Sequence, residues 1–422
     1  MTKSKPNKSI CIYLQIHQPY RINSVEKPLE ANWQDFFIGP NPGKNGEDMR
    51  NKTIFEKVAK TCYIPTTKFW IDLCKKYPQI KLTLSFSGTF LEQCLEYPEY
   101  GREILDLFKT LLKTNQLEIL DETYYHSLVF MVDTKEYVDQ IMLHREMVKK
   151  IFDYEPTNFR NTELIYNNNI GEIIRNLGYK SILIEDAWWN EKAKQGEIDS
   201  IFINKPVELS KDELDYIKSK KIQHEPEDNL KLILRDVESS DGIMFIDSQP
   251  NKLGESVLTS NKKYIGTFTD YEFLGEHNST AGGAFKNIDD QIALLIENNC
   301  KFETADNVAA DIDSSTLLQY DCLKYSSWGH VQRDITVWRG GEQQEIAFSK
   351  LTDLYKKVKD KNDPELIQTW RRFSTSCHFY FLGNKKGGDK DFVDLFSPYQ
   401  NVSDALEKYI SAANSFNILA EK

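Results

Sequence analysis

The chain has 422 residues and a formal net charge of −11, with 40% hydrophobic and 28% charged residues. These proportions are typical of a globular protein with a large core and argue against a long disordered chain. Nucleic acid and anionic membranes are poor partners for so acidic a chain, and no apolar run approaches the roughly 18 residues that span a bilayer. The composition is compatible with a neutral ligand such as a sugar.

Seven short apolar runs recur in the first 270 residues, and each is followed by polar residues. The runs are Ser9–Ile16, Lys81–Phe86, Leu117–Leu120, Asn158–Asn161, Lys180–Ile184, Leu230–Leu234 and Tyr264–Phe268. Most are rich in β-branched and other apolar residues, as expected for parallel strands that are buried on both faces. The polar residues are therefore expected at the carboxyl-terminal ends of these strands.

Helical patterns separate many of the runs, at residues 57–77, 100–114, 134–151 and 170–177, and Gly178 is a suitable C-cap for the last. Strands that alternate with helices predict βαβ units and a parallel sheet. Because polar groups follow all seven strands, the pattern favours a barrel over an open sheet.

Two stretches interrupt this alternation. Residues 20–52 are rich in Pro, Asn and Gly and are predicted to form a long loop at the rim, whereas residues 187–228 are charged and are predicted to cross over the rim. After residue 285 the patterns are largely helical. The sequence therefore predicts a barrel domain over residues 1–285 and a helical subdomain over residues 286–422.

The seven cysteines are odd in number and widely spaced, with no CxxC pair. This spacing fits neither a disulfide framework nor a zinc site and predicts reduced, mostly buried thiols. The first apolar run directly follows the basic N-terminal residues and is interpreted as a strand instead of a signal peptide. We therefore expect a cytoplasmic protein.

In barrels of this kind the chemistry lies at the carboxyl-terminal rim. That rule selects His17, Gln18, Glu122, His126, Glu163, Glu185, Asp186, Arg235 and Asp270. Glu163 and Asp270 follow the fourth and seventh runs, and on a closed barrel these two positions can face each other. Two facing carboxyl groups are what glycoside hydrolysis requires.

The neighbours of the two carboxyl groups predict their roles. Arg160 precedes Glu163 and is expected to lower its pKa, which favours an ionised nucleophile. Tyr271 and Glu272 follow Asp270 and are expected to raise its pKa, which suits a proton donor.

The histidines His17, His126 and His277 are candidate hydrogen-bond partners of sugar hydroxyls. Neither HxH nor HExxH occurs in the sequence, so we predict no metal ion. Two other classes remain as alternatives. A metal-dependent carbohydrate deacetylase would need His and Asp ligands that converge on one ion, and a non-catalytic glucan-binding protein would need neither Glu163 nor Asp270.

Five motif regions occur in order along the chain. They are Gln15–Tyr20, which contains His17-Gln18-Pro19; Gln116–Leu120 with Glu122–Leu128; Arg160–Tyr166; Asp270–His277; and Ser327-Trp328 with Arg333-Asp334 and Trp338. Together they resemble family 57 of the glycoside hydrolases, in its α-amylase-type branch, over roughly residues 9–400.

The resemblance implies a distorted seven-stranded (β/α)7 barrel, followed by a helical region that reaches back to the substrate cleft. It also implies a retaining mechanism without a cofactor, in which Glu163 is the nucleophile and Asp270 the general acid/base. The implied reaction cleaves internal α-1,4 bonds of starch- or glycogen-type glucans. The substrate-binding candidates are His17, Gln18, Glu122, His126, Arg160, Glu272, His277, Trp328, Asp334 and Trp338.

The fifth region departs from the family pattern. This chain has SSWGHVQRDITVW where the family usually has SWADxERDxSAW, so that Gly329, His330 and Gln332 replace an Ala, an Asp and a Glu. The family includes amylases, glucanotransferases, branching enzymes and α-galactosidases. Substrate preference therefore stays open, with a 4-α-glucanotransferase as the main alternative, and so does the oligomeric state.

Overall fold

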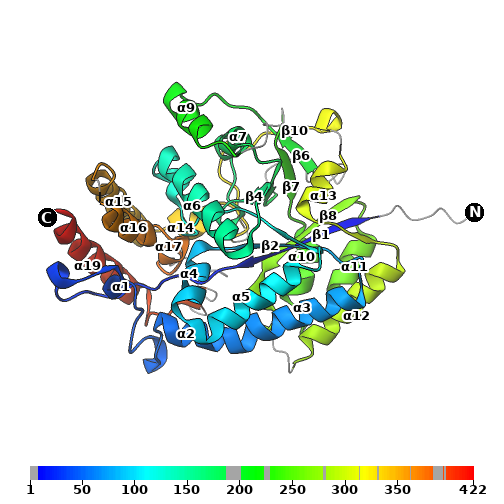
Figure 1. Cartoon of the computed structure of the whole chain (residues 1–422), viewed down its shortest axis with the longest axis horizontal. Coiled ribbons are helices and arrows are strands. Elements are labelled where there is room, and N and C mark those ends of the chain that lie inside the picture. The colour runs from blue at the N-terminus through cyan, green and yellow to red at the C-terminus, as the bar shows by residue number, and fades with distance from the viewer. Residues whose placement is uncertain are drawn as a thin grey trace, which may run out of the picture.

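The computed structural model describes residues 8–186, 201–222, 229–278, 282–312, 314–329, 332–361, 363–383, 393 and 396–422. Strands surrounded by helices form most of the molecule, and a group of C-terminal helices lies at one end (Figure 1). Strand β1 (Ser9–Ile16) runs toward these helices. The carboxyl-terminal ends of the strands parallel to β1 therefore face the C-terminal helices.

All seven predicted strands are present. They are β1, β2 (Leu82–Phe86), β3 (Leu117–Ile119), β4 (Asn158–Arg160), β5 (Ser181–Ile184), β7 (Lys231–Leu234) and β8 (Tyr264–Asp270). Nearly every residue in them is buried. This burial on both faces explains why the runs are continuously apolar and do not alternate.

The seven strands close into a parallel barrel. β3, β2, β1 and β8 form one sheet, and β4, β5 and β7 belong to a second. A bridge between Asp121 and Phe159 joins β3 to β4, and a bridge between Arg235 and Gly266 joins β7 to β8. The (β/α)7 barrel that the resemblance implies is thus confirmed.

The barrel is distorted between β7 and β8. Strand β6 (Ile201–Asn204) pairs antiparallel with β7, so that Ile201 faces Ile233. The end of β7 is joined to β8 by the Arg235–Gly266 bridge and by a 2.9 Å hydrogen bond from Nε of Arg235 to the carbonyl of Phe268. Strand β10 (Gln319–Tyr320) adds to β6, and β9 (Lys301–Phe302) adds to β1. The sequence predicts helices after residue 285 and misses these two strands, because two residues are too few to show a strand pattern.

Helices cover the outside of the barrel. They are α2 (Asn51–Val58), α3 (Ile64–Lys76), α4 (Gly88–Glu96), α5 (Pro98–Leu112), α6 (Thr134–Phe152), α7 (Asn168–Leu177), α9 (Lys211–Ser219), α10 (Val237–Met244), α11 (Lys252–Thr259) and α12 (Ala284–Glu297). A π-helical turn, Ala59–Tyr63, joins α2 to α3. Gly178 ends α7 with φ of +99°, as the sequence predicts, since only glycine adopts this conformation readily.

The remaining helices follow the barrel. They are α13 (Ala305–Ala310), α14 (Thr336–Arg339), α15 (Glu342–Val358), α16 (Pro364–Phe373), α17 (Ser376–Tyr380) and α19 (Val402–Ala420). One hydrophobic cluster contains both Ile182 of the barrel and Trp370 of α16, so the two parts share a core. The division of the chain at residue 285 stays a prediction.

The predicted rim loop at residues 20–52 packs against the C-terminal helices. It contains two single turns, η1 (Pro28–Glu30) and η2 (Lys44–Gly46), and the short helix α1 (Trp33–Phe36). Phe36 is fully buried between Phe373 and Phe416, with ring centroids 6.1 Å away in both cases. The backbone N–H of Ile22 donates to the Tyr399 hydroxyl at 3.0 Å. This loop is therefore anchored by core contacts.

Of the predicted excursion at residues 187–228, residues 187–200 and 223–228 lie outside the described residues.

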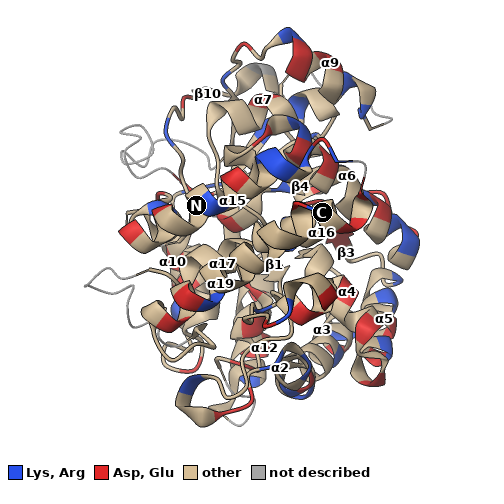
Figure 2. Ribbon diagram, turned by 90° about the vertical axis from the view of Figure 1, so that its left-hand side faces the viewer, with Lys and Arg blue, Asp and Glu red and all other residues tan. Residues whose placement is uncertain are grey.

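Six of the seven free cysteines are buried and Cys377 is partly exposed. No described helix is both long and apolar enough to cross a membrane. Acidic and basic residues are interspersed over the outer helices in the view of Figure 2, the mixed pattern of a solvated surface.

Candidate active site

Glu163 lies directly after β4, in the turn Thr162–Leu164. Its φ is +56° and that of Leu164 is +51°, a left-handed backbone conformation that residues other than glycine rarely adopt. The carbonyl oxygen of Glu163 accepts hydrogen bonds from the backbone N–H of Trp328 at 3.3 Å and from the Ser327 hydroxyl at 3.2 Å. Such strain costs about 1–3 kcal/mol per residue and concentrates at functional sites, so the turn itself marks Glu163 as a candidate.

The Glu163 carboxylate accepts hydrogen bonds on both oxygens. Nε2 of His126 lies 3.0 Å and Oγ of Ser376 3.4 Å from Oε1, and Nε1 of Trp328 donates to Oε2 at 2.7 Å. Burial alone would raise the pKa of Glu163, but the hydrogen bond and charge of His126, with the charge of Arg160, outweigh it and lower the pKa. The group is thus ionised at neutral pH, as the sequence predicts.

His126 lies between two carboxylates. Its Nδ1 is 3.3 Å from Oε1 of Glu122, on the opposite side of the ring from Glu163. Burial would lower the pKa of His126, yet the hydrogen bonds to Glu122 and Glu163 raise it. Glu122 is itself fully buried and accepts from Nε2 of Gln15 at 2.8 Å and from the Ser85 hydroxyl at 2.7 Å. His126 is therefore held in a fixed orientation against the Glu163 carboxylate, which raises the pKa of its imidazole.

The pKa of Asp270, the last residue of β8, is shifted in the direction opposite to that of Glu163. Burial and the nearby charge of Glu163 raise the pKa of Asp270 to about 7, against a smaller lowering by Arg160. Burial and the charge of Asp270 also raise the pKa of Glu272 to about 8. Glu272 accepts a hydrogen bond from the Tyr63 hydroxyl at 2.8 Å and lies 3.3 Å from the backbone N–H of His17. Asp270 thus stays protonated below about pH 7, a range in which Glu163 is already charged.

His17 stacks on His126, with ring centroids 4.0 Å apart. Its Nδ1 lies 2.7 Å from Oγ of Ser87 and its Nε2 lies 3.3 Å from Sγ of Cys377. Burial and the positive charge of His126 lower the pKa of His17 well below its usual value. The two stacked rings therefore have pKa values that are shifted in opposite directions.

Of the aromatic residues in the fifth motif, the structure brings Trp328 to the site. Besides its hydrogen bond to Glu163, its ring packs 5.1 Å from the Arg160 guanidinium and 5.9 Å from that of Arg235. Arg235 also forms a 3.0 Å ion pair with Glu185, a fully buried rim residue. Trp328 therefore contacts the Glu163 carboxylate through a hydrogen bond and two guanidinium groups through cation–π interactions.

Other predicted site residues lie apart from Glu163. Asp334 accepts two hydrogen bonds from Thr336, at 2.8 and 2.6 Å, at the start of α14. Trp338 is buried in the core, and a Cβ at Gly329 would come within 2.3 Å of its ring. In this structure the site of Gly329 therefore has no room for a side chain unless the Trp338 ring moves. His330 lies outside the described residues.

Two further candidates have local partners. Gln18 is buried, where its Oε1 accepts from Arg21 at 3.3 Å and its carbonyl accepts from Gln93 at 3.0 Å. His277 is exposed, with the rings of Phe273 and Phe396 at 5.1 and 5.0 Å. Within the described part of the chain, neither side chain forms a hydrogen bond with Glu163.

Ser376 and Cys377 of α17 are site residues that the sequence does not reveal. Besides its contact to Glu163, Ser376 donates its backbone N–H to the carbonyl of His126 at 2.9 Å. The C-terminal helices therefore complete a site whose carboxyl groups come from the barrel.

A parallel barrel whose carboxyl-terminal rim holds two carboxyl groups with opposite pKa shifts is the arrangement of a glycosidase. The chain belongs to glycosyl hydrolase family 57, whose model matches residues 11–292. This match confirms the family that the five motif regions predict, and with it the class of enzyme.

Several relatives of this chain have names that refer to α-glucan enzymes. A Methanocaldococcus jannaschii protein named "Putative alpha-amylase" is 28% identical over 427 residues, which cover 96% of this chain and 84% of that protein. The structure of a 4-alpha-glucanotransferase from Thermococcus litoralis has a TM-score of 0.65 at 14% identity, over 97% of this chain and 60% of that one. A family 57 branching enzyme from Thermococcus kodakaraensis has a TM-score of 0.65 at 10% identity, over 98% and 90% of the two chains. At these identities the two structures establish the fold alone, and this chain spans 60% of the length of the glucanotransferase.

Replacing Trp328 by phenylalanine should lower kcat/KM by about 10- to 150-fold, because a hydrogen bond to a charged group contributes roughly 1.5–3 kcal/mol. Loss of the Nε1 donor also raises the pKa of Glu163, which moves the acidic limb of the pH–rate profile to higher pH. The control is Trp338→Phe, which alters a core tryptophan and should leave the acidic limb in place. An unshifted limb in Trp328→Phe would show that Nε1 does not act on the carboxylate.

Proposed function

We propose that this glycosidase cleaves internal α-1,4 bonds of starch- or glycogen-type glucans with retention of configuration. The observation that carries the proposal is the pair of opposite pKa shifts, which keeps Glu163 ionised and Asp270 protonated at the same pH. A nucleophile and a proton donor are the two groups that a retaining enzyme needs at once.

The reaction follows in two balanced steps. In the first, an oxygen of Glu163 bonds to the anomeric carbon while the glycosidic bond breaks, and the leaving oxygen takes the proton of Asp270. In the second, the Asp270 carboxylate takes a proton from water, and that water oxygen displaces Glu163 from the sugar. His126 and Trp328 hold the Glu163 carboxylate in place through both steps, so little reorganisation is needed.

The substrate class is supported by the names of the relatives. Alpha-amylase, 4-alpha-glucanotransferase and branching enzyme all denote proteins that act on α-glucans. The second candidate function is 4-α-glucanotransferase, favoured by the likeness to the Thermococcus litoralis enzyme. The two activities share the first step and differ in whether water or a sugar hydroxyl receives the glycosyl group.

Product analysis with maltoheptaose tests the proposal. A hydrolase of internal bonds gives shorter maltooligosaccharides of several lengths from the earliest times, with one new reducing end for each bond cleaved. Longer and shorter products without new reducing ends would indicate a transferase instead of a hydrolase. Cleavage should survive EDTA, which a metal-dependent deacetylase would not explain, because maltoheptaose carries no acetyl group. Binding of maltoheptaose without any product would favour a non-catalytic glucan-binding protein.

A further inference from the structure

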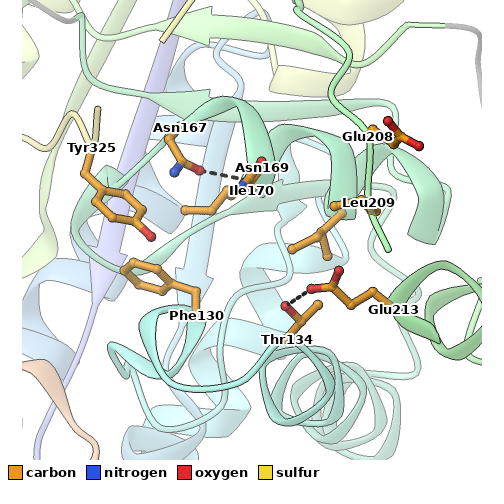
Figure 3. A pocket seen from close by; sticks show the side chains of 10 residues that line it. Phe130, Thr134, Asn167, Asn169, Ile170, Glu208, Leu209, Glu213 and Tyr325 are labelled. Carbon is orange, nitrogen blue, oxygen red and sulfur yellow. Dashed lines mark hydrogen bonds between the residues drawn. The ribbon is translucent and has the colours of Figure 1, made fainter. Parts of the chain in front are cut away.

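A cavity of about 120 Å³ lies among the outer helices of the barrel, at the first turns of α6, α7 and α9 (Figure 3). A single water needs roughly 10–15 Å³, so the cavity can hold a group much larger than water. It is lined by none of the residues that contact Glu163. The cavity is thus distinct from the candidate active site.

Two aromatic rings form one wall. Phe130 and Tyr325 have ring centroids 5.7 Å apart, inclined at 56°, and both are partly exposed. Figure 3 shows them on one side of the cavity, with Ile170 and Leu209 beyond. A pyranose ring presents an apolar C–H face, which packs well on aromatic and aliphatic side chains of this kind.

Polar groups surround this apolar wall. Asn167 caps α7, where its Oδ1 accepts the backbone N–H of Ile170 at 3.0 Å, and its Nδ2 lies on the side of Tyr325 (Figure 3). Asn169 and Glu208 are exposed and also line the cavity. Amides and carboxylates in this arrangement can donate to and accept from hydroxyl groups.

The charge of the lining restricts the ligand. Glu208 and Glu213 contribute carboxylates, and neither Lys nor Arg is among the described residues that line the cavity. Glu213 is already engaged, since it accepts from the Thr134 hydroxyl at 2.7 Å and caps α9 through Ser210. A phosphate or carboxylate ligand would therefore meet repulsion, whereas a neutral polyhydroxylated ring would not.

The cavity is connected to the nucleophile by a short two-stranded segment. Tyr166 and Ser326 exchange backbone hydrogen bonds of 3.1 and 2.9 Å. Asn167 and Tyr325 follow and precede this pair on the cavity side, whereas Glu163 and Trp328 meet at the other end. An experiment on Tyr325 must therefore separate lost binding from a disturbed active site.

We propose that this cavity is a second carbohydrate site, which binds one glucosyl unit of an α-glucan chain outside the catalytic centre. The identity of the sugar rests on the proposed function. Phe130 and Tyr325 pack on the sugar ring, and Asn167, Asn169 and Glu208 bind its hydroxyl groups. The ligand is neutral and takes no part in bond cleavage at this position.

Calorimetric titration with maltotriose tests this site in the Glu163→Gln protein, which cannot consume the ligand. Two binding events are expected, and Tyr325→Ala in the same background should weaken one of them by roughly tenfold or more, as loss of a stacking ring does. The matched control is Tyr325→Phe, which keeps the ring and should retain both events. Asn169→Ala, an exposed change, should weaken the same event by roughly 2- to 10-fold.

A single binding event in Glu163→Gln, or two events that neither Tyr325→Ala nor Asn169→Ala alters, would overturn the second site. If Tyr325→Ala does not fold, as judged by its circular dichroism, the Asn169→Ala and Phe130→Ala proteins decide the question. Wild-type cleavage of maltoheptaose distinguishes the two failures. If maltoheptaose is cleaved and only one binding event is seen, the second site is wrong and the proposed function stands. If maltoheptaose is not cleaved and no binding is seen, the proposed function is wrong.

Discussion

Replacing Glu163 by alanine should lower kcat for maltoheptaose by between about 10⁴- and 10⁶-fold, the range typical of a lost nucleophile. The structure holds this carboxylate ionised and fixes it by three side-chain hydrogen bonds. Release of reducing ends measures the loss. Glu276→Gln is the control, because Glu276 is engaged by Lys57 at 2.8 Å and Thr61 at 2.7 Å, and it should remain close to wild type.

Azide distinguishes a lost nucleophile from a disturbed fold. In Glu163→Ala, azide can enter the space of the missing carboxylate and attack the anomeric carbon from the same face. With α-maltotriosyl fluoride as substrate the product should be the β-glycosyl azide, which NMR identifies. An α-glycosyl azide, or wild-type activity without azide, would contradict the nucleophilic role of Glu163.

Replacing Asp270 by asparagine should lower kcat/KM for maltoheptaose by about 10²- to 10⁴-fold, the usual contribution of a general acid. The loss for α-maltotriosyl fluoride should be much smaller, because fluoride leaves with little help from a proton. Hydrolysis of the glycosyl-enzyme loses its general base, so added azide should restore turnover and give the α-glycosyl azide. Equal losses for both substrates would argue against proton donation by Asp270.

The ionisation of Asp270 also determines the expected pH–rate profile. The Asp270 carboxyl must be protonated to act as the acid, and its pKa is about 7, so wild-type kcat/KM should fall as pH rises through about 7. The acidic limb should lie below the usual range for a glutamate, because the pKa of Glu163 is lowered. In Asp270→Asn the alkaline fall should disappear for α-maltotriosyl fluoride. A fall near pH 7 that persists in this variant would belong to another group.

Strands of the barrel could be predicted because burial on both faces leaves a direct mark on the sequence. The run at Ser9–Ile16 is the clearest example, since all eight of its residues are buried. Strand β6 is equally buried and apolar, but its four residues stand within a charged stretch that is predicted to cross over the rim, and β10 is shorter still. The pairing of β6 with β7 depends on tertiary contacts, which a local sequence pattern does not predict.

The sequence is most informative about the candidate site where position along a strand decides the contact. Glu163, His126 and Asp270 all follow strands or their first loops, and the structure places them around one centre. Arg160 was the expected cation beside Glu163, but His126 has the larger effect on its pKa because it also donates a hydrogen bond. Ser376 was missed because a helical pattern does not show which distant element its side chains reach.

The loop at residues 20–52 has a consequence for turnover. Phe36 lies in the core of the C-terminal helices, and Ile22 is hydrogen-bonded to Tyr399, so the early chain ties those helices to the barrel. A hinge motion that swung the helices away would have to expose this aromatic cluster to water. We therefore expect the C-terminal helices to keep their place against the barrel during turnover, so that the rate of product release depends on how tightly the site holds its ligand instead of on a motion of these helices.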